Sequence, residues 1–290
     1  MKPLKIIVLA KQVPDTRNVG KDAMKADGTV NRAALEAIFN PEDLNALEQA
    51  LRIKDQAEGS QVTLLTMGPG RAAEIIREGL YRGADHGFLL TDRKFAGSDT
   101  LATSYSIARA VSQNEYDIII AGRQAIDGDT AQVGPQVAEK LNIPQVTYVE
   151  AIEEITEFYI IARRRLDNGI ERVKSPLPVL ITVHGSAPPC RPRIARRVMK
   201  YKHARTLTEL QDASEDYIRL FQDRPYLKID EWSVADIKAD EDALGLSGSP
   251  TKVKKIENVV FKAKESRILE NSDQDIESLI KELIDNHTIG

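Results

Sequence analysis

One loop of this sequence carries the residues best suited to bind a charged ligand. The segment 122–135 reads Gly-Arg-Gln-Ala-Ile-Asp-Gly-Asp-Thr-Ala-Gln-Val-Gly-Pro. It follows an apolar run over 116–121 that is typical of a buried strand, and it precedes a helical pattern over 132–141. A glycine-rich loop between a strand and a helix presents free backbone N–H groups at the positive end of the helix dipole. The loop therefore indicates a phosphate site, and hence a nucleotide or dinucleotide ligand.

An ordinary capped helix after a strand explains the same loop. Asp129 or Thr130 is a suitable N-cap, and Gln132 stands three residues after Asp129, as in a capping box. Asp127 and Asp129 weigh against a phosphate, because carboxylates repel it unless they point away or bind ribose and ring atoms. Gly128 and Gly134 would let a ligand approach the backbone closely. From this loop alone, both interpretations stay open.

Three further segments each start a helix, two of them directly after a strand. They are Asn-Pro-Glu-Asp at 40–43, Gly-Pro-Gly at 68–70, and Gly-Ser-Asp-Thr-Leu-Ala-Thr at 97–103. Taken singly, each is more simply a helix start, with Asn40 as a suitable N-cap and Pro41 at the first helical position. Loops that follow strands of one parallel sheet meet at one edge. Their convergence would be stronger evidence for a binding site than any single loop.

The first half of the chain alternates strands and helices, which predicts an α/β fold. The apolar runs are continuous, as in strands that helices cover on both faces, and the order favours a doubly wound parallel sheet. Strand-like runs cover 5–10, 61–67, 87–90 and 116–121, and helical patterns cover 41–58, 71–81, 100–111 and 132–141.

The second half has a different pattern. Shorter strands are predicted at 145–149, 158–165, 170–174 and 179–183, with a hairpin turn at 167–169, where Asn-Gly tolerates positive φ. Beyond residue 188 the periodicity is lost, apart from two short helices between 203 and 258 and one over 276–284. We therefore divide the chain into a nucleotide-binding α/β domain, 1–189, and an extension, 190–290.

Composition excludes several classes of function. The 290 residues are 42% hydrophobic and 29% charged, with a net charge of −4, so nothing favours nucleic acid as a partner. The single cysteine, Cys190, allows no disulfide framework and fits the cytoplasm. The four histidines show no metal spacing, no catalytic triad is visible, and no segment is long enough to span a membrane. We expect no catalytic side chain and no bound metal.

A basic cluster stands out against the acidic background. Arginine and lysine occupy six of the positions from 191 to 202. Such a cluster suits an acidic partner or a cofactor phosphate, and a solvated basic loop explains it equally.

Together these motifs resemble the β subunit of electron transfer flavoproteins, over about residues 1–202. The resemblance is carried by Ala-Lys-Gln-Val-Pro-Asp at 10–15, Asn-Pro-Glu-Asp at 40–43, Met-Gly-Pro at 67–69, Gly-Ala-Asp at 83–85, the loop 122–134 and the hairpin residues between 162 and 182. Asn168 departs from the family's hairpin pattern, which usually has glycine or an acidic residue there.

The resemblance implies a heterodimer in which an α subunit holds a redox-active FAD. The β subunit is then an adenine nucleotide α-hydrolase-like domain that holds AMP or, in electron-bifurcating members, a second FAD. The loop 127–135 and the segment 97–103 look like the bifurcating form. NADH would reduce the β-bound FAD, and electrons would pass to an acyl-CoA dehydrogenase-like flavoenzyme and to a ferredoxin or flavodoxin. The alternatives are a conventional carrier with structural AMP, and a stand-alone stress-type nucleotide-binding module.

The resemblance also carries over site residues. Arg123 is expected near the isoalloxazine, and Thr100 and Thr103 at the second phosphate and ribityl chain. The segment 192–202 matches the loop that docks a partner dehydrogenase, but it is about two residues shorter than usual and lacks the leucine that plugs the partner. The extension is expected to pack on the partner subunit. The full nucleotide set is Leu9, Ala10, Asn40, Asp43, Met67, Gly68, Thr100, Thr103, Arg123, Gln124, Asp127, Thr130, Ala131, Gln132, Val133 and Gly134, and the docking set is Arg193, Ile194, Arg196, Arg197, Met199 and Lys200.

Overall fold

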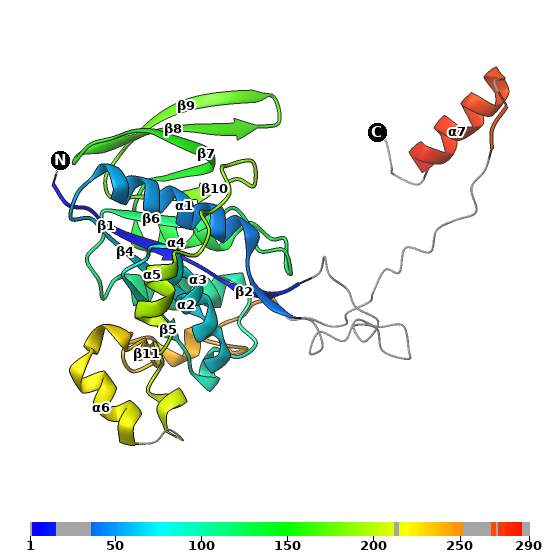
Figure 1. The fold of residues 1–290 in the computed structure, drawn as a ribbon. Coiled ribbons are helices and arrows are strands. Elements are labelled where there is room, and N and C mark those ends of the chain that lie inside the picture. Colours follow the sequence, from blue (N-terminus) through cyan, green and yellow to red (C-terminus); the bar gives the residue numbers. More distant parts are fainter. Residues whose placement is uncertain (1, 16–35, 212–214, 252–267, 271, 286–290) are drawn as a thin grey trace.

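A nine-stranded sheet forms the centre of the protein (Figure 1). This computed structural model describes residues 2–15, 36–211, 215–251, 268–270 and 272–285. The strand order is β11-β5-β4-β1-β6-β10-β7-β8-β9, parallel from β11 to β7 and antiparallel beyond. The strands are β1 (Lys5–Leu9), β4 (Gln61–Met67), β5 (His86–Leu90), β6 (Ile118–Gly122), β7 (Gln145–Ile155), β8 (Tyr159–Leu166), β9 (Gly169–Pro176), β10 (Val179–Val183) and β11 (Asp230–Trp232), while β2 (Gln12–Pro14) and β3 (Ala37–Phe39) form a small separate sheet.

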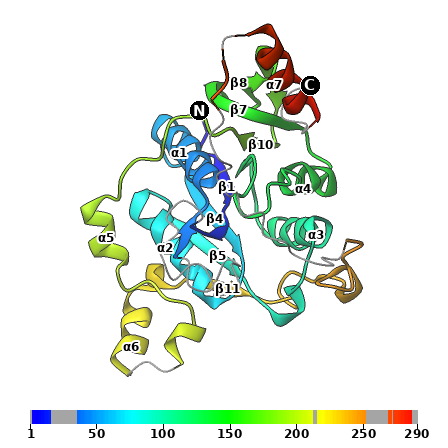
Figure 2. The ribbon, with the colours of Figure 1, turned by 90° about the vertical axis from the view of Figure 1, so that its right-hand side faces the viewer.

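Helices cover both faces of the parallel strands. Figure 2 shows α1 and α2 on one face and α3 and α4 on the other. The helices are α1 (Pro41–Gln56), α2 (Ala73–Arg82), α3 (Thr100–Val111), α4 (Val133–Leu141), α5 (Ala195–Tyr201), α6 (Glu215–Asp223) and α7 (Asp273–Asp285), and the 3-10 turns are η2 (Gly70–Ala72), η3 (Arg93–Phe95), η4 (Thr208–Leu210), η5 (Pro225–Leu227) and η6 (Glu241–Ala243). The doubly wound architecture predicted from the sequence is confirmed.

Alternate residues of each central strand pack on opposite faces of the sheet. Ile6 and Val8 of β1 belong to the apolar cluster under α1, whereas Ile7 and Leu9 belong to the cluster under α3 and α4. All four side chains are buried. Both faces therefore exclude water, which explains why the strand reads as an unbroken apolar run rather than as an alternating one.

The chain changes direction across the sheet at β1. It passes from β1 to β4 and β5 on one side, and then returns through α3 to β6 on the other side of β1. Helices on the two sides of this reversal lie on opposite faces, so they diverge above the carboxyl ends of β1 and β6. In open α/β sheets this divergence is where ligands bind.

The predicted hairpin is present and extends the sheet. β7 continues to Ile155 and pairs with β8, which turns into β9 through Asp167 and Asn168. The turn was expected to need a positive φ at both Asn168 and Gly169. Of these two residues only Gly169 has a positive φ, of 150°. The two turn residues lie just before it, so the glycine ends the turn instead of forming its centre.

Residues beyond 189 also contribute to the sheet. β11 pairs with β5 in parallel, and Ile229 and Val234 on either side of it are buried. The sequence analysis misses this strand, because three residues with two acidic side chains show no periodicity. The division of the chain at residue 189 stays a prediction. The predicted C-terminal helix is confirmed as α7, and its apolar residues Ile276 and Ile280 are exposed.

Candidate functional site

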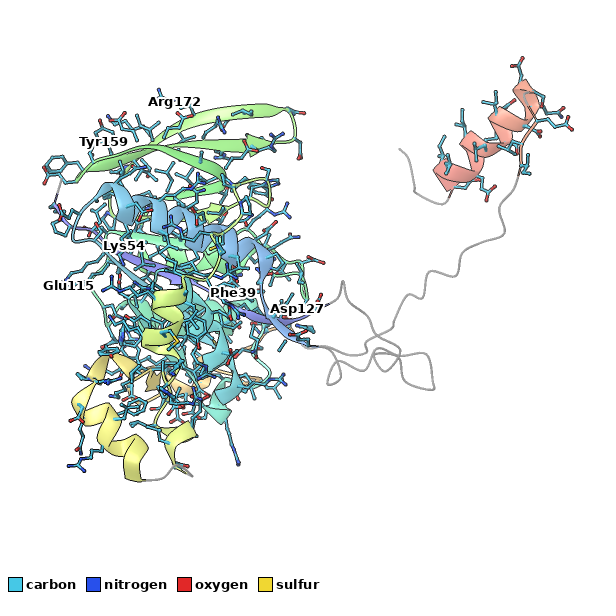
Figure 3. All side chains as sticks on the ribbon, viewed as in Figure 1. Phe39, Lys54, Glu115, Asp127, Tyr159 and Arg172 are labelled. Carbon is cyan, nitrogen blue, oxygen red and sulfur yellow. The ribbon has the colours of Figure 1, made fainter. Side chains whose placement is uncertain are left out.

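The loops singled out in the sequence meet at the carboxyl edge of the sheet. The loops that follow β1, β4 and β6 and the start of α1 all lie there. Figure 3 shows Asp127 and Phe39 at this end of the strands, and Glu115, which precedes β6, at the opposite end. The topological reversal and the convergence of loops therefore coincide.

The Asp43 carboxylate joins three of these segments. From the first turn of α1 it accepts hydrogen bonds from the backbone N–H of Lys11 at 2.8 Å and of Gly122 at 3.0 Å. The side chain is buried, and burial raises the pKa of this carboxyl group to about 7. Asp43 therefore fixes the ends of β1 and β6 relative to α1, as a structural support of the site.

Asn40 supports the loop after β6 from the same side. Its amide nitrogen donates to the carbonyl oxygen of Gln124 at 2.9 Å, and its amide oxygen accepts from the backbone N–H of Ile126 at 3.2 Å. Asn40 does stand at the N-cap position with Pro41 following, as predicted, but its side chain makes no capping hydrogen bond. Both the amide nitrogen and the amide oxygen of Asn40 bond to the loop, and neither caps the helix.

The carboxylates at this edge are paired with cations. Lys11 Nζ lies 2.7 and 2.9 Å from the two carboxylate oxygens of Asp127, and Arg123 Nη2 lies 3.0 Å from Glu42 Oε1. The second oxygen of Glu42 accepts from the backbone N–H of Gln124 at 3.0 Å. Of the two carboxylates that weigh against a phosphate in the sequence, Asp127 is therefore offset by Lys11, whereas Asp129 is bonded to the neutral amide of Gln124.

The start of α4 has the features of an anion site. Gln132 is the N-cap residue and makes no side-chain capping bond. The backbone N–H groups of Val133 and Gly134 have no hydrogen-bond partner among the described residues. Ala131, just before, has a φ of +52°, a strained conformation for a residue with a side chain. Free amides beside a left-handed residue form a concave donor set that fits a phosphate group.

The predicted capping box is therefore wrong. Asp129 has a φ of +49°, and its carboxylate accepts from the side-chain amide of Gln124 at 3.0 Å instead of from α4. Thr130 is exposed and makes no capping bond either. The loop conformation directs the Asp129 carboxylate to Gln124, and neither Asp129 nor Thr130 reaches the first amides of α4.

The two glycines of the loop serve different purposes. A Cβ on Gly134 would lie 2.7 Å from Cγ2 of Thr182 in β10, so the glycine is needed for α4 to pack on the sheet. A Cβ on Gly128 would meet nothing within 4 Å. Gly134 thus faces the sheet, and its contribution to the site is its backbone N–H.

The start of α3 lies beside the start of α4. The segment 97–103 starts a helix, as predicted, and Asp99 caps α3 by accepting from the N–H of Leu101 at 2.9 Å and of Ala102 at 3.0 Å. The Thr100 hydroxyl donates to Gln132 Oε1 at 3.0 Å. Thr103 is half-buried one turn along the same helix. The start of α3 therefore adds hydroxyl groups beside the free amides of α4, whereas its own amides at Leu101 and Ala102 are capped by Asp99.

The remaining predicted nucleotide residues lie at the ends of β1 and β4. Leu9 points into the apolar core, so only its backbone is available. The Ala10 N–H donates to Leu65 O at 3.0 Å, and the Gly68 N–H donates to Leu90 O at 3.1 Å. Met67 is half-buried. The structure brings these residues to the edge, and nucleotide binding by them stays a prediction.

The predicted docking set divides into two groups. Arg193 pairs with Glu78 at 3.0 Å, and Arg197 donates to carbonyl oxygens at the end of α2, including that of Leu80 at 2.8 Å. These two side chains hold α5 on α2. The others face outward: Met199 and Ile194 are 65% and 42% exposed, Arg196 has no hydrogen-bond or ion-pair partner among the described residues, and Lys200 lies over the rings of Tyr201 and Tyr226.

Sequence reasoning did not single out Lys11 as a site residue. Its only signal was its place in the 10–15 motif, directly after Leu9 and Ala10.

A surface cavity of about 480 Å³ lies at the opposite edge, lined by residues that include Lys5, His86 and Glu115. Within the described ranges, no group of three or more metal-ligating side chains is present, and no helix has the length and apolar character needed to cross a membrane.

Comparison with known proteins agrees with this architecture. Residues 27–206 match the family model described as the electron transfer flavoprotein domain. The chain is 43% identical over 252 residues to the electron transfer flavoprotein subunit beta of Clostridium acetobutylicum, covering 87% of each chain. It is 40% identical over 290 residues to the acryloyl-CoA reductase electron transfer subunit gamma of Anaerotignum propionicum, covering 99% of this chain and all of the relative. It is 41% identical over 251 residues to subunit CarD of the caffeyl-CoA reductase–Etf complex of Acetobacterium woodii, covering 86% of each.

Proposed function

The chain belongs to the electron transfer flavoprotein family as a β-type subunit, and we propose that it binds FAD at the carboxyl edge of its sheet and works in electron bifurcation. In this proposal NADH is the electron donor. One electron goes through a flavin of the α subunit to an acyl-CoA dehydrogenase-like flavoenzyme, and the other goes to a ferredoxin or flavodoxin. When bound, FAD supplies the redox chemistry, and the protein contributes binding, orientation and electrostatic tuning.

One observation carries the proposal of a nucleotide. Unpaired backbone amides at the start of α4 lie where the sheet topology reverses, beside Ala131 at a φ of +52°. Amide donors at a helix N-terminus suit a diphosphate, since they supply positive charge without needing a side chain. Asp43 and Asn40, both buried, hold this loop against β1 and α1.

The contact between α3 and α4 favours FAD over AMP. The Thr100–Gln132 hydrogen bond places a threonine hydroxyl of α3 directly beside the start of α4. A monophosphate needs only one such group of donors. We propose that on binding Thr100 exchanges its bond to Gln132 for one to the second phosphate, and that Thr103, one turn along α3, serves the ribityl chain, in line with the bifurcating form of the segment 97–103.

Two features support the partners that we propose. The names of two relatives include acryloyl-CoA reductase and caffeyl-CoA reductase, which are enzymes of acyl-CoA compounds. The outward group of the docking set combines exposed apolar and cationic side chains, with Met199 as its most exposed apolar residue. We propose that these residues dock the flavoenzyme, and that the extension 190–290 packs on the α subunit.

Nucleotide counting tests the proposed function. The chain is co-expressed with its α subunit, the complex is denatured, and the released nucleotides are separated and quantified. We expect two FAD per heterodimer. One FAD with one AMP would indicate a conventional electron carrier instead of a bifurcating protein. A colourless monomer that is stable without an α subunit would favour the stress-type module, and a complex without any adenine nucleotide in the β chain would refute the site itself.

A further inference from the structure

Three side chains form a column beside the nucleotide loop. The guanidinium carbon of Arg123 lies 5.7 Å from the ring centroid of Tyr148. The rings of Tyr148 and His184 are stacked, with 6.1 Å between centroids and 30° between planes. Arg123 follows β6, Tyr148 belongs to β7 and His184 follows β10. Three neighbouring strands thus contribute one side chain each at the carboxyl edge.

Tyr148 is held in a strained conformation. Its φ of +60° lies in the left-handed region, which is rare and strained for a bulky residue. The pairing of β7 with β10 shifts register at this point, and the N–H of Tyr148 donates to Thr182 Oγ1 at 3.2 Å. Irregularities of this kind redirect a side chain next to a functional site. Here the redirected ring lies against Arg123.

Both ends of the column are anchored. At one end, Glu42 holds the Arg123 guanidinium through an oxygen at 3.0 Å. At the other, the Ser186 N–H donates to Nδ1 of His184 at 3.1 Å, and the Ser186 hydroxyl donates to the buried carboxylate of Glu150. The aromatic rings therefore have little freedom to move, and the face that Tyr148 offers to Arg123 is fixed.

We propose that Tyr148 and His184 are positioning residues, which hold the Arg123 guanidinium against the isoalloxazine ring of FAD. This inference rests on the proposed function and on the expectation, from the family resemblance, that Arg123 lies near that ring. The ion pair with Glu42 holds the guanidinium from one side, and the Tyr148 ring contacts it as a cation–π partner.

Replacing Tyr148 by glycine separates this role from a structural one. Tyr148→Gly removes the ring and also the steric strain at φ +60°, so the fold is not expected to lose stability from the backbone. Tyr148→Phe keeps the ring and removes only the hydroxyl. Asn142→Gly is a matched control, because Asn142 has a φ of +52° at the end of α4 and lies outside the column.

The readouts are the dissociation constants of FAD and of AMP and the midpoint potential of the β-bound flavin, all measured on the complex with the α subunit. For Tyr148→Gly we expect a threefold to tenfold weaker binding of FAD, unchanged binding of AMP, which has no isoalloxazine, and a lower midpoint potential. Tyr148→Phe and Asn142→Gly should behave as the wild-type protein. In an Arg123→Ala background, Tyr148→Gly should have no further effect.

Three results would overturn the inference. They are wild-type FAD binding and potential in Tyr148→Gly, equal weakening of FAD and AMP, and a full additional effect of Tyr148→Gly on top of Arg123→Ala. The wild-type measurement distinguishes failure of the proposed function, since a wild-type complex that binds AMP but no FAD in the β chain refutes that proposal before any variant is compared.

Discussion

Gly122 and Asp43 fit together so closely that Gly122 cannot carry a side chain. The Asp43 carboxylate accepts from the Gly122 N–H at 3.0 Å, and a Cβ on Gly122 would lie 2.3 Å from that same carboxylate. The last residue of β6 therefore has to be glycine for the start of α1 to reach it. The contact therefore fixes the position of the end of β6 relative to α1. The nucleotide loop begins at the next residue, Arg123.

The burial of Asp43 predicts a pH-dependent stability. Its pKa of about 7 in the folded chain compares with about 3.9 in the unfolded chain. Between these values the folded state binds more protons, so the free energy of unfolding falls as the pH rises from 4 to 7, by up to roughly 4 kcal/mol from this group. Asp43→Asn cannot ionise and should lose this dependence, at a cost of about 1–3 kcal/mol for the backbone donor it leaves unpaired.

Urea unfolding of the full chain at pH 5 and pH 8 measures this effect. The difference between the wild-type protein and Asp43→Asn cancels the contributions of all other groups. We expect the variant to be less destabilised, relative to the wild-type protein, at pH 8 than at pH 5. Parallel pH profiles for the two proteins would show that Asp43 does not titrate in this range.

The packing of Gly134 on β10 predicts a second destabilising change. Gly134→Ala would place a methyl group 2.7 Å from Cγ2 of Thr182, and overpacking of this kind costs about 1–3 kcal/mol. Thr182→Ser removes that Cγ2 and should rescue the variant. Gly128→Ala is the matched control in the same loop, where the space is open, and it should change stability by less than about 0.5 kcal/mol. Thermal unfolding measures all three, and equal effects of the two alanine variants would contradict the packing argument.

The sequence was sufficient for the parts of the fold that local patterns specify. The apolar runs located β1, β4, β5 and β6, and the loops between strands and helices located the carboxyl edge, because each of these signals lies within a few consecutive residues. The segment 97–103 was read correctly as a helix start for the same reason, since the N–H groups that donate to Asp99 lie only two and three residues away.

What the sequence did not show depends on contacts between distant residues. The Lys11–Asp127 ion pair joins positions 116 residues apart, and β11 exists because Asp230 meets Phe88 at the sheet edge. Asp129 was assigned to a cap because its spacing to Gln132 fits a capping box, yet the loop conformation gives it to Gln124 instead. Local spacing cannot reveal a competing partner that only the folded loop provides.

The Lys11–Asp127 ion pair predicts different effects of its two partners on nucleotide binding. Both side chains are partly exposed, so breaking the pair should change stability by less than about 1 kcal/mol. Lys11→Gln removes a cation from the amide-rich edge and should weaken nucleotide binding roughly tenfold, because a hydrogen bond to a charged group contributes about 1.5–3 kcal/mol. Asp127→Asn leaves Lys11 free and should not weaken it.

Equilibrium binding of FAD to the nucleotide-depleted complex tests this contrast, at low and at high salt. The effect of Lys11→Gln should shrink at high salt, where exposed charges are screened. Equal weakening by the two variants would show that the ion pair matters because it holds the loop after β6 against the end of β1. Lys11 would then not contact the phosphates.

The two groups within α5 and its flanks predict a separation of stability from docking. Arg197→Ala removes the donor to the Leu80 carbonyl and should destabilise the contact of α5 with α2 by about 1–3 kcal/mol. Met199→Ala changes an exposed side chain and should leave the free energy of unfolding within about 0.5 kcal/mol of the wild-type value.

If the outward group docks the flavoenzyme, Met199→Ala should instead raise the concentration of that enzyme needed for half-maximal electron transfer. Arg196→Glu, which reverses a charge without a partner in the described part of the chain, should do the same with a stronger dependence on salt. Unchanged transfer in both variants would place the docking surface elsewhere on the protein.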